Sequence, residues 1–166
     1  MCYEQYPAWI ILISNFVSIA IYLIGAFVIY KLGLVWLLAY LAYVLFLEIR
    51  VVSTHCVNCC YYGKSCAFAK GRLSAMFFKK GNPKEFCKAE MTWKDILPDF
   101  LVSIIPLIAG IVLLIIKFDS ILLLLLILLT AFTFSGNAFV RQNLACKHCK
   151  QKKLGCPAQK LFEKAK

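Results

Sequence analysis

The chain has 166 residues, of which 62% are hydrophobic and only 16% are charged, and its formal net charge is +11. A soluble domain carries about a quarter charged residues, so this composition excludes an ordinary soluble domain. It predicts an all-α integral membrane protein, in which long apolar helices contact lipid instead of water.

Four long apolar runs account for most of the hydrophobic residues. We expect four transmembrane helices, at about residues 8–30, 32–49, 99–116 and 120–140. Roughly 17–25 apolar residues span a bilayer as a helix, so the first, third and fourth runs are long enough. The second run ends at Glu48 and Arg50, whose side chains can extend toward the headgroups. Short turns join these runs into two helical hairpins.

The basic residues are distributed unevenly around the predicted helices. Of the 19 Lys and Arg residues, nine lie in the connector 50–94 and eight in the tail 141–166. Only Lys31 and Lys117 lie in the two turns. Positive charge collects in cytoplasmic loops, so we expect the N-terminus, the connector and the tail in the cytoplasm. Membrane topology and contact with anionic lipid headgroups explain the net charge, and no nucleic-acid partner is required.

The cysteines follow a repeated spacing. Cys-x-x-Cys followed by a third cysteine seven residues later occurs twice, 90 positions apart, as Cys56, Cys59 and Cys66 and as Cys146, Cys149 and Cys156. The apolar runs shift by nearly the same distance. We therefore interpret residues 1–97 and 98–166 as two parallel repeats. Each is a helical hairpin followed by a cysteine knuckle, at residues 56–66 and 146–156.

The cysteine spacing predicts a metal site on the cytoplasmic side. One Cys-x-x-Cys turn can place two sulfurs on an ion, and a second turn can complete a tetrahedral shell. Disulfides are disfavoured because thiols stay reduced in the cytoplasm. Sulfur ligation suits zinc (Zn2+), which we favour, or an iron–sulfur cluster. The predicted metal ligands are Cys56, Cys59, Cys60, Cys66, Cys87, Cys146, Cys149 and Cys156.

Two ligand arrangements remain open. In the first, the two Cys-x-x-Cys pairs form one four-sulfur site, and the third cysteines belong to a second site with Cys87, Cys60 or a histidine. In the second, each triplet binds its own ion, with His55, His148 or Cys87 as the fourth ligand. The spacing does not choose between these arrangements.

A polar stripe lies in the first run and consists of Ser14, Asn15, Ser18 and Tyr22. Side chains four residues apart are neighbours on a helix surface, so most of this stripe shares one face. We expect it to serve helix–helix contacts, together with Gly25, Gly110 and Gly136. The alternative is a cofactor cavity for a lipid or a quinone. No charged residue lies deep within the four runs, which argues against an ion pump.

The two repeats differ by an insert at residues 67–97. Its first part, Cys66–Lys80, mixes apolar and basic residues and is typical of a segment at the membrane interface. A flap that covers the first cysteine knuckle is an equal alternative. In the tail we expect a short C-terminal helix beginning at Pro157.

These features favour a non-catalytic accessory or anchoring subunit with a structural metal module, which would associate with other subunits of a membrane complex. Metal would join the two repeats, because their short loops cannot build a soluble core. One alternative is an iron–sulfur or dithiol oxidoreductase that exchanges electrons with a quinone-like carrier. Another is a relay for a soft metal ion. No nucleophile–histidine–acid set or phosphate loop indicates a different class of enzyme.

Overall fold

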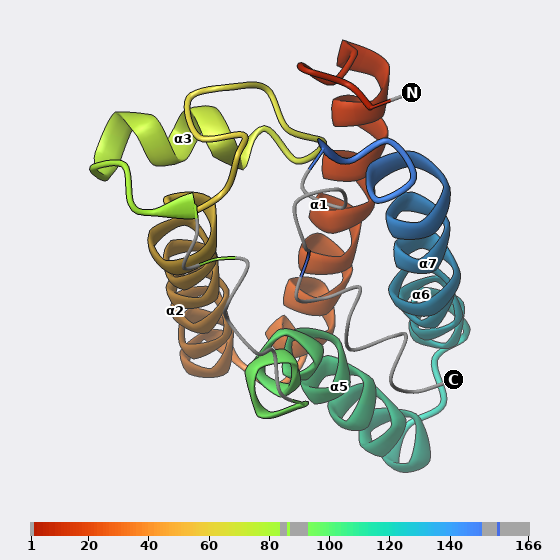
Figure 1. The fold of residues 1–166 in the computed structure, drawn as a ribbon. Helices are drawn as coiled ribbons and strands as arrows, with labels where there is room; N and C mark the ends of the chain where they lie inside the picture. Colours follow the sequence, from red (N-terminus) through yellow and green to blue (C-terminus); the bar gives the residue numbers. More distant parts are fainter. Residues whose placement is uncertain (1, 84–85, 87–92, 151–155, 157–166) are drawn as a thin grey trace.

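The computed structural model describes residues 2–83, 86, 93–150 and 156, and within these ranges every regular element is helical (Figure 1). Four helices are long and apolar enough to cross a membrane: Ala8–Tyr30, Leu34–Cys56, Ile96–Ile116 and Ser120–Ala145. This confirms the four predicted helices and suggests a membrane protein. The two repeats and the cytoplasmic sidedness stay predictions. The expected C-terminal helix lies outside the described residues.

Large apolar side chains cover the outside of the bundle. On α1 (Ala8–Tyr30), for example, Leu12 is 70% exposed and Leu23 is 65% exposed. The other three long helices carry similar exposed residues along their length. Soluble proteins rarely expose apolar patches of this extent, whereas a lipid environment accommodates them.

Helices α1 and α5 (Trp93–Ile116) form the middle of the bundle. They pack against each other, and each also packs against α2 (Leu34–Val51) and α6 (Ser120–Ala131). In Figure 1, α2 and α6 stand on opposite sides of α1. We call the end of the bundle where α2 and the fourth span lead into cysteines the cysteine end. The opposite end, with the turns at residues 31–33 and 117–119, is the turn end.

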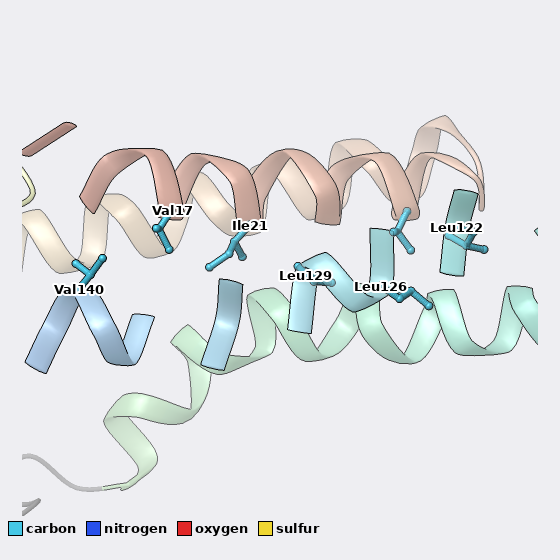
Figure 2. Packing of buried hydrophobic residues seen from close by; sticks show 7 residues of the cluster. Val17, Ile21, Leu122, Leu126, Leu129 and Val140 are labelled. Atoms are coloured by element: carbon cyan, nitrogen blue, oxygen red, sulfur yellow. The ribbon is translucent and has the colours of Figure 1, made fainter. Parts of the chain in front are cut away.

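The core between α1 and the fourth span consists of apolar side chains at helical spacing. Val17 and Ile21 of α1 lie toward Leu126 and Leu129 of α6 (Figure 2), and all four are buried. They recur every three or four residues, so they share one face of each helix. Because lipid is as apolar as these side chains, close packing rather than removal from water holds the helices together.

Glycines mark the closest approaches between helices. A Cβ on Gly110 would lie 2.5 Å from a methyl group of Leu126, and a Cβ on Gly136 would lie 3.2 Å from Val17. Small residues at such positions allow helix backbones to approach in a membrane. The predicted role of these glycines in helix–helix contacts is therefore confirmed.

Gly25 leaves space for a side-chain hydrogen bond that replaces the backbone hydrogen bond lost at a proline in α5. Pro106 has no N–H, so the carbonyl of Val102, four residues earlier in α5, lacks its helical donor. The Tyr40 hydroxyl of α2 donates to that carbonyl at 3.0 Å. A Cβ on Gly25 would lie 3.0 Å from Tyr40 Cζ and closer still to the hydroxyl oxygen. Gly25 and Tyr40 together thus keep a backbone carbonyl satisfied where water is absent.

An ion pair joins the two turns at the turn end. Lys31 Nζ, which follows α1, lies 3.1 Å from Oδ2 of Asp119, which precedes α6. Asp119 also caps α6, because its Oδ1 accepts hydrogen bonds from the N–H groups of Ile121 and Leu122 at 3.0 and 3.4 Å. The two hairpins are therefore connected where each reverses direction.

Both spans that lead to the cysteines end in π-helical turns. Helix α2 continues as η1 (Val52–Cys56), and α6 continues through η2 (Phe132–Gly136), α7 (Asn137–Phe139) and η3 (Val140–Ala145). The helices thus continue beyond the predicted spans, which end at about residues 49 and 140, and α5 begins before the third span predicted from about residue 99. Hydropathy marks the part of a helix that lies in lipid, whereas backbone hydrogen bonding continues beyond it.

Candidate cysteine site

The two Cys-x-x-Cys motifs have the same backbone hydrogen bond. The N–H of Cys59 donates to the carbonyl of Cys56, and the N–H of Cys149 donates to the carbonyl of Cys146, both at 3.3 Å. One π-helical segment ends at Cys56, the first cysteine of the first motif, and another ends at Ala145, just before the second motif. A hydrogen bond between positions i and i+3 closes a tight turn, so the two cysteines of each motif stay close together.

Thiols from both motifs surround one buried cluster at the cysteine end. We call it the tyrosine cluster, and its members are Tyr6, Ile10, Tyr61, Ala67 and Ala145. Its two tyrosines are 5% and 3% exposed, and their ring centroids lie 5.6 Å apart. Packed against it and partly buried are Cys59, Cys60, Cys66 and Cys149. Four of the eight predicted ligands therefore come together from loops that are far apart in the chain.

The Tyr61 hydroxyl connects three segments within the tyrosine cluster. It donates to the carbonyl of Tyr3 at 2.7 Å and accepts from the N–H of Lys150 at 2.9 Å. The Tyr3 N–H in turn donates to the carbonyl of His148 at 3.0 Å. The N-terminal segment is thereby fixed between the loop after α2 and the loop after η3.

Sequence reasoning missed the N-terminal segment as part of the site. The Tyr6 hydroxyl donates to the carbonyl of Ala145, and the Cys2 thiol lies 3.8 Å from the carbonyl oxygen of Cys149. The sequence feature that could have indicated its role is the pair Tyr3 and Tyr6 just before the first span, where tyrosine and tryptophan rings are common. That signal does not say which backbone groups the hydroxyls reach.

Cys59 and Cys60 form a hydrogen-bonded thiol pair. The Cys59 sulfur accepts hydrogen bonds from the Cys60 thiol and from the N–H groups of Tyr61 and Cys60. These hydrogen bonds lower the pKa of Cys59 to about 7, although burial alone would raise it. The same thiol hydrogen bond and burial raise the pKa of Cys60, and nearby Cys149 raises it further. Near neutral pH, Cys59 is therefore partly a thiolate, the form that attacks disulfides and binds metal.

The other predicted ligands that the structure describes lie in different settings. Cys66 is close enough to Cys56 to interact with it electrostatically. Cys146 is exposed and Cys156 is partly buried. Cys87 lies outside the described residues. Each of the eight described cysteines is a thiol rather than half of a disulfide.

The described part of the chain contains no ready-made metal centre. No three of its His, Cys, Asp and Glu side chains form a group that could hold a metal ion. Tetrahedral zinc needs ligands at about 2.3 Å for sulfur, so the clustered thiols would have to turn toward a common point. The choice between one site and two sites, and the identity of any fourth ligand, stay open.

Three of the four side chains in the polar stripe of α1 make hydrogen bonds within the protein. The Asn15 amide and the Ser18 hydroxyl donate to carbonyls of α1 itself, at 2.8 and 3.2 Å. The Ser14 hydroxyl is buried and makes no hydrogen bond. A groove of about 440 Å³ lies elsewhere, between α5 and α6, where six apolar residues and Thr130 line it. A lipid or quinone cavity at the stripe stays a prediction.

The last member of the stripe, Tyr22, belongs to a polar contact that the sequence did not reveal. Its hydroxyl donates to Glu48 Oε1 at 2.6 Å, and Lys70 Nζ lies 2.7 Å from Glu48 Oε2. The lysine and glutamate side chains are 23% and 28% exposed. Lys70 is the first residue of α3 (Lys70–Phe77), so this contact joins α1, α2 and α3 beside the loop that carries Cys66.

The chemistry available at the cysteine end is that of soft, partly buried thiols. Such groups bind soft metal ions as thiolates, and a close pair can form a disulfide by exchange. The two possibilities rest on the residues of this chain alone. No family model, curated protein or solved structure matches the chain.

Proposed function

We propose that this multi-pass membrane protein binds a soft metal ion, with zinc favoured, through thiolates at its cysteine end, and that this end faces the cytoplasm. The ion would join the loop after α2 to the loop after η3. In this proposal the protein is a non-catalytic accessory or anchoring subunit, and the metal is structural.

The meeting of thiols from both loops carries the proposal. Cys59 and Cys60 follow α2, Cys149 follows η3, and all three pack on the tyrosine cluster. The two Cys-x-x-Cys turns share the same hydrogen bond, and α1 and α5 have matching neighbours. These likenesses support a duplicated unit whose two copies contribute ligands to the same region. The concentration of Lys and Arg in the connector and tail supports the cytoplasmic side.

The lowered pKa of Cys59 also supports metal binding. Cysteine binds metal as a thiolate, so each ligand must lose its proton. A pKa of about 7 for Cys59 means that one ligand is already partly ionised near neutral pH. An ion that binds the folded protein but not separated loops stabilises the folded state by mass action. Zinc prefers four tetrahedral sulfur or nitrogen ligands, and an iron–sulfur cluster would use the same thiols.

The test is elemental analysis of protein purified without oxygen, together with its visible absorption. We expect stoichiometric zinc and no colour. Iron with acid-labile sulfide and absorption near 400 nm, roughly where such clusters absorb, would replace zinc by a redox cluster. A purified protein that contains no metal and takes up no added zinc would refute metal binding.

Cysteine variants then test whether the metal is structural. Cys149→Ser should lower zinc content and thermal stability together, because it removes a thiol of the second loop. Cys2→Ser is the matched control, since the Cys2 thiol also lies beside this loop, 3.8 Å from the carbonyl oxygen of Cys149, but Cys2 is not among the predicted ligands. A Cys149→Ser protein that loses zinc but keeps its full thermal stability would remove the structural role.

A dithiol oxidoreductase is the second candidate, and the Cys59–Cys60 hydrogen bond favours it. In this function two thiols would release two protons and two electrons to form a disulfide, and a quinone would take them up to become a quinol. Metal-free wild-type protein treated with a soluble quinone should then lose two thiols per chain, and Cys60→Ser protein should not. Equal thiol loss in both proteins would exclude this pair as the redox site.

A further inference from the structure

Helix α3 presents an exposed apolar face at the cysteine end. Leu73, Met76 and Phe77 are 44%, 75% and 71% exposed. Residues three and four apart lie on one side of a helix, so these side chains form one continuous face. In Figure 1, α3 lies across the end of α2 and extends beyond it, away from α1. An amphipathic helix at a membrane surface has this transverse orientation.

The opposite side of α3 is fixed to the rest of the protein. Ser74 is fully buried, and its hydroxyl lies 3.4 Å from the carbonyl oxygen of Val52 in η1. A Cβ on Gly71 would overlap the carbonyl of Tyr61, and the Gly71 N–H lies 3.4 Å from the Cys66 sulfur. The apolar face is therefore held outward by its attachment to η1 and the cysteine loop, and by the Lys70–Glu48 ion pair.

Basic side chains accompany the apolar face. Arg72 lies within α3 and is exposed, and Lys79 and Lys80, which come just after the C-cap residue Phe78, are also exposed. No acidic residue occurs between Lys64 and Lys80. An apolar face bordered by cations matches the boundary between acyl chains and anionic headgroups. The same boundary already lies close by, because α2 exposes Phe46 and Ile49 near its end.

We propose that α3 binds the surface of a bilayer that contains anionic phospholipids. Leu73, Met76 and Phe77 would enter the region between headgroups and acyl chains, while Arg72 and the two lysines contact lipid phosphates. Each basic side chain near such a surface favours binding by roughly fivefold. This face therefore fits lipid better than an acidic protein. An acidic protein would neutralise the cations, but it would also need an apolar groove that matches the three large apolar side chains.

Hydrogen–deuterium exchange of the full-length protein in nanodiscs tests the proposal. Amides of residues 73–78 should exchange at least tenfold more slowly when phosphatidylglycerol is mixed into phosphatidylcholine. The triple variant Arg72→Gln, Lys79→Gln, Lys80→Gln should lose this difference. The matched control Lys31→Gln, Lys117→Gln, which removes cations at the turn end, should keep it.

Two further measurements separate lipid from other anions and from misfolding. Inorganic phosphate added to phosphatidylcholine discs should leave exchange in α3 unchanged, and slowing by phosphate would overturn the assignment to lipid. The variant Met76→Ser, Phe77→Ser should speed exchange in α3 in both lipids while exchange in α1 stays as in wild type. Equal exchange of residues 73–78 in the two lipid compositions would also overturn the proposal.

Discussion

Removing the Tyr61 hydroxyl should loosen the contact between the two cysteine loops. Tyr61→Phe keeps the buried ring but leaves the Tyr3 carbonyl and the Lys150 N–H without the partner that now lies 2.7 and 2.9 Å away. Burial raises the pKa of Tyr61 to about 12, so the wild-type hydroxyl holds its proton at ordinary pH and can donate. The substitution therefore removes one donated and one accepted hydrogen bond at any practical pH.

The expected loss follows from the surroundings of the two backbone groups. A protein hydrogen bond contributes about 0.5–1.5 kcal/mol net, so two give about 1–3 kcal/mol. Lys150 is exposed, and water can replace its lost partner, which favours the lower part of that range. A change of about 1–2 kcal/mol corresponds to roughly a 5- to 30-fold larger population in which the loop carrying Cys149 is detached.

Alkylation of Cys149 in metal-free protein measures this population. The rate with N-ethylmaleimide, followed on the Cys149 peptide by mass spectrometry, should rise by roughly the same factor in Tyr61→Phe. Tyr62→Phe is the matched control, since the Tyr62 hydroxyl donates to the carbonyl of Phe78 at 2.6 Å, at the end of α3, and not to the second loop. Equal alkylation rates in wild type and Tyr61→Phe, with both proteins folded, would refute the role of the hydroxyl as a link.

Three further changes test other parts of the structure. Gly25→Ala should lower the free energy of unfolding by about 1–2 kcal/mol, because overpacking against Tyr40 outweighs the gain in helix propensity; adding Tyr40→Phe should recover part of the loss in a double-mutant cycle. Cys60→Ala should raise the pKa of Cys59 from about 7 toward that of an ordinary thiol. Iodoacetamide alkylation of Cys59 at neutral pH should then slow roughly tenfold. An unchanged alkylation rate would contradict the thiol hydrogen bond. Asp119 has a lowered pKa because it accepts hydrogen bonds from Lys31 and from backbone N–H groups. The ionised carboxylate therefore stabilises the fold at pH values above the pKa of Asp119 in the unfolded chain, and this stabilisation is lost as acid protonates the carboxylate. Asp119→Asn should lower the melting temperature at neutral pH but not in acid.

The membrane helices could be predicted because the physical requirement is simple. A bilayer needs about 20 apolar residues per helix, and the chain supplies four such runs. Glycines at helix contacts followed from the same reasoning, since small residues let membrane helices approach. The ends of the helices could not be read in this way. The turns η1 and η3 carry polar residues yet remain helical, because backbone hydrogen bonding does not depend on the hydropathy of the side chains.

The cysteine site could be predicted in part. Repeated spacing indicated that Cys59 and Cys149 belong to related turns, and the structure brings both to the tyrosine cluster. The repeated spacing gave no sign that Cys60 would be hydrogen-bonded to Cys59 and lower the pKa of Cys59. In the second triplet a lysine occupies the position that corresponds to Cys60. Nor could the spacing show that Tyr61 reaches two backbone groups. Those contacts depend on where main-chain carbonyls and N–H groups lie, and side-chain patterns do not encode those positions.

The contacts between the two cysteine loops lie where a small membrane protein needs additional stabilisation. Inside the bilayer, α1 and α5 gain no hydrophobic advantage from meeting each other rather than lipid. Outside it, loops of this length bury only a small core. The cysteine end compensates by concentrating buried tyrosines, backbone hydrogen bonds and thiols where the loops meet. The Gly71 N–H donates to the Cys66 sulfur at 3.4 Å, and a Cβ at Gly71 would overlap the Tyr61 carbonyl. The position of α3 and the geometry of the thiols are therefore mechanically connected.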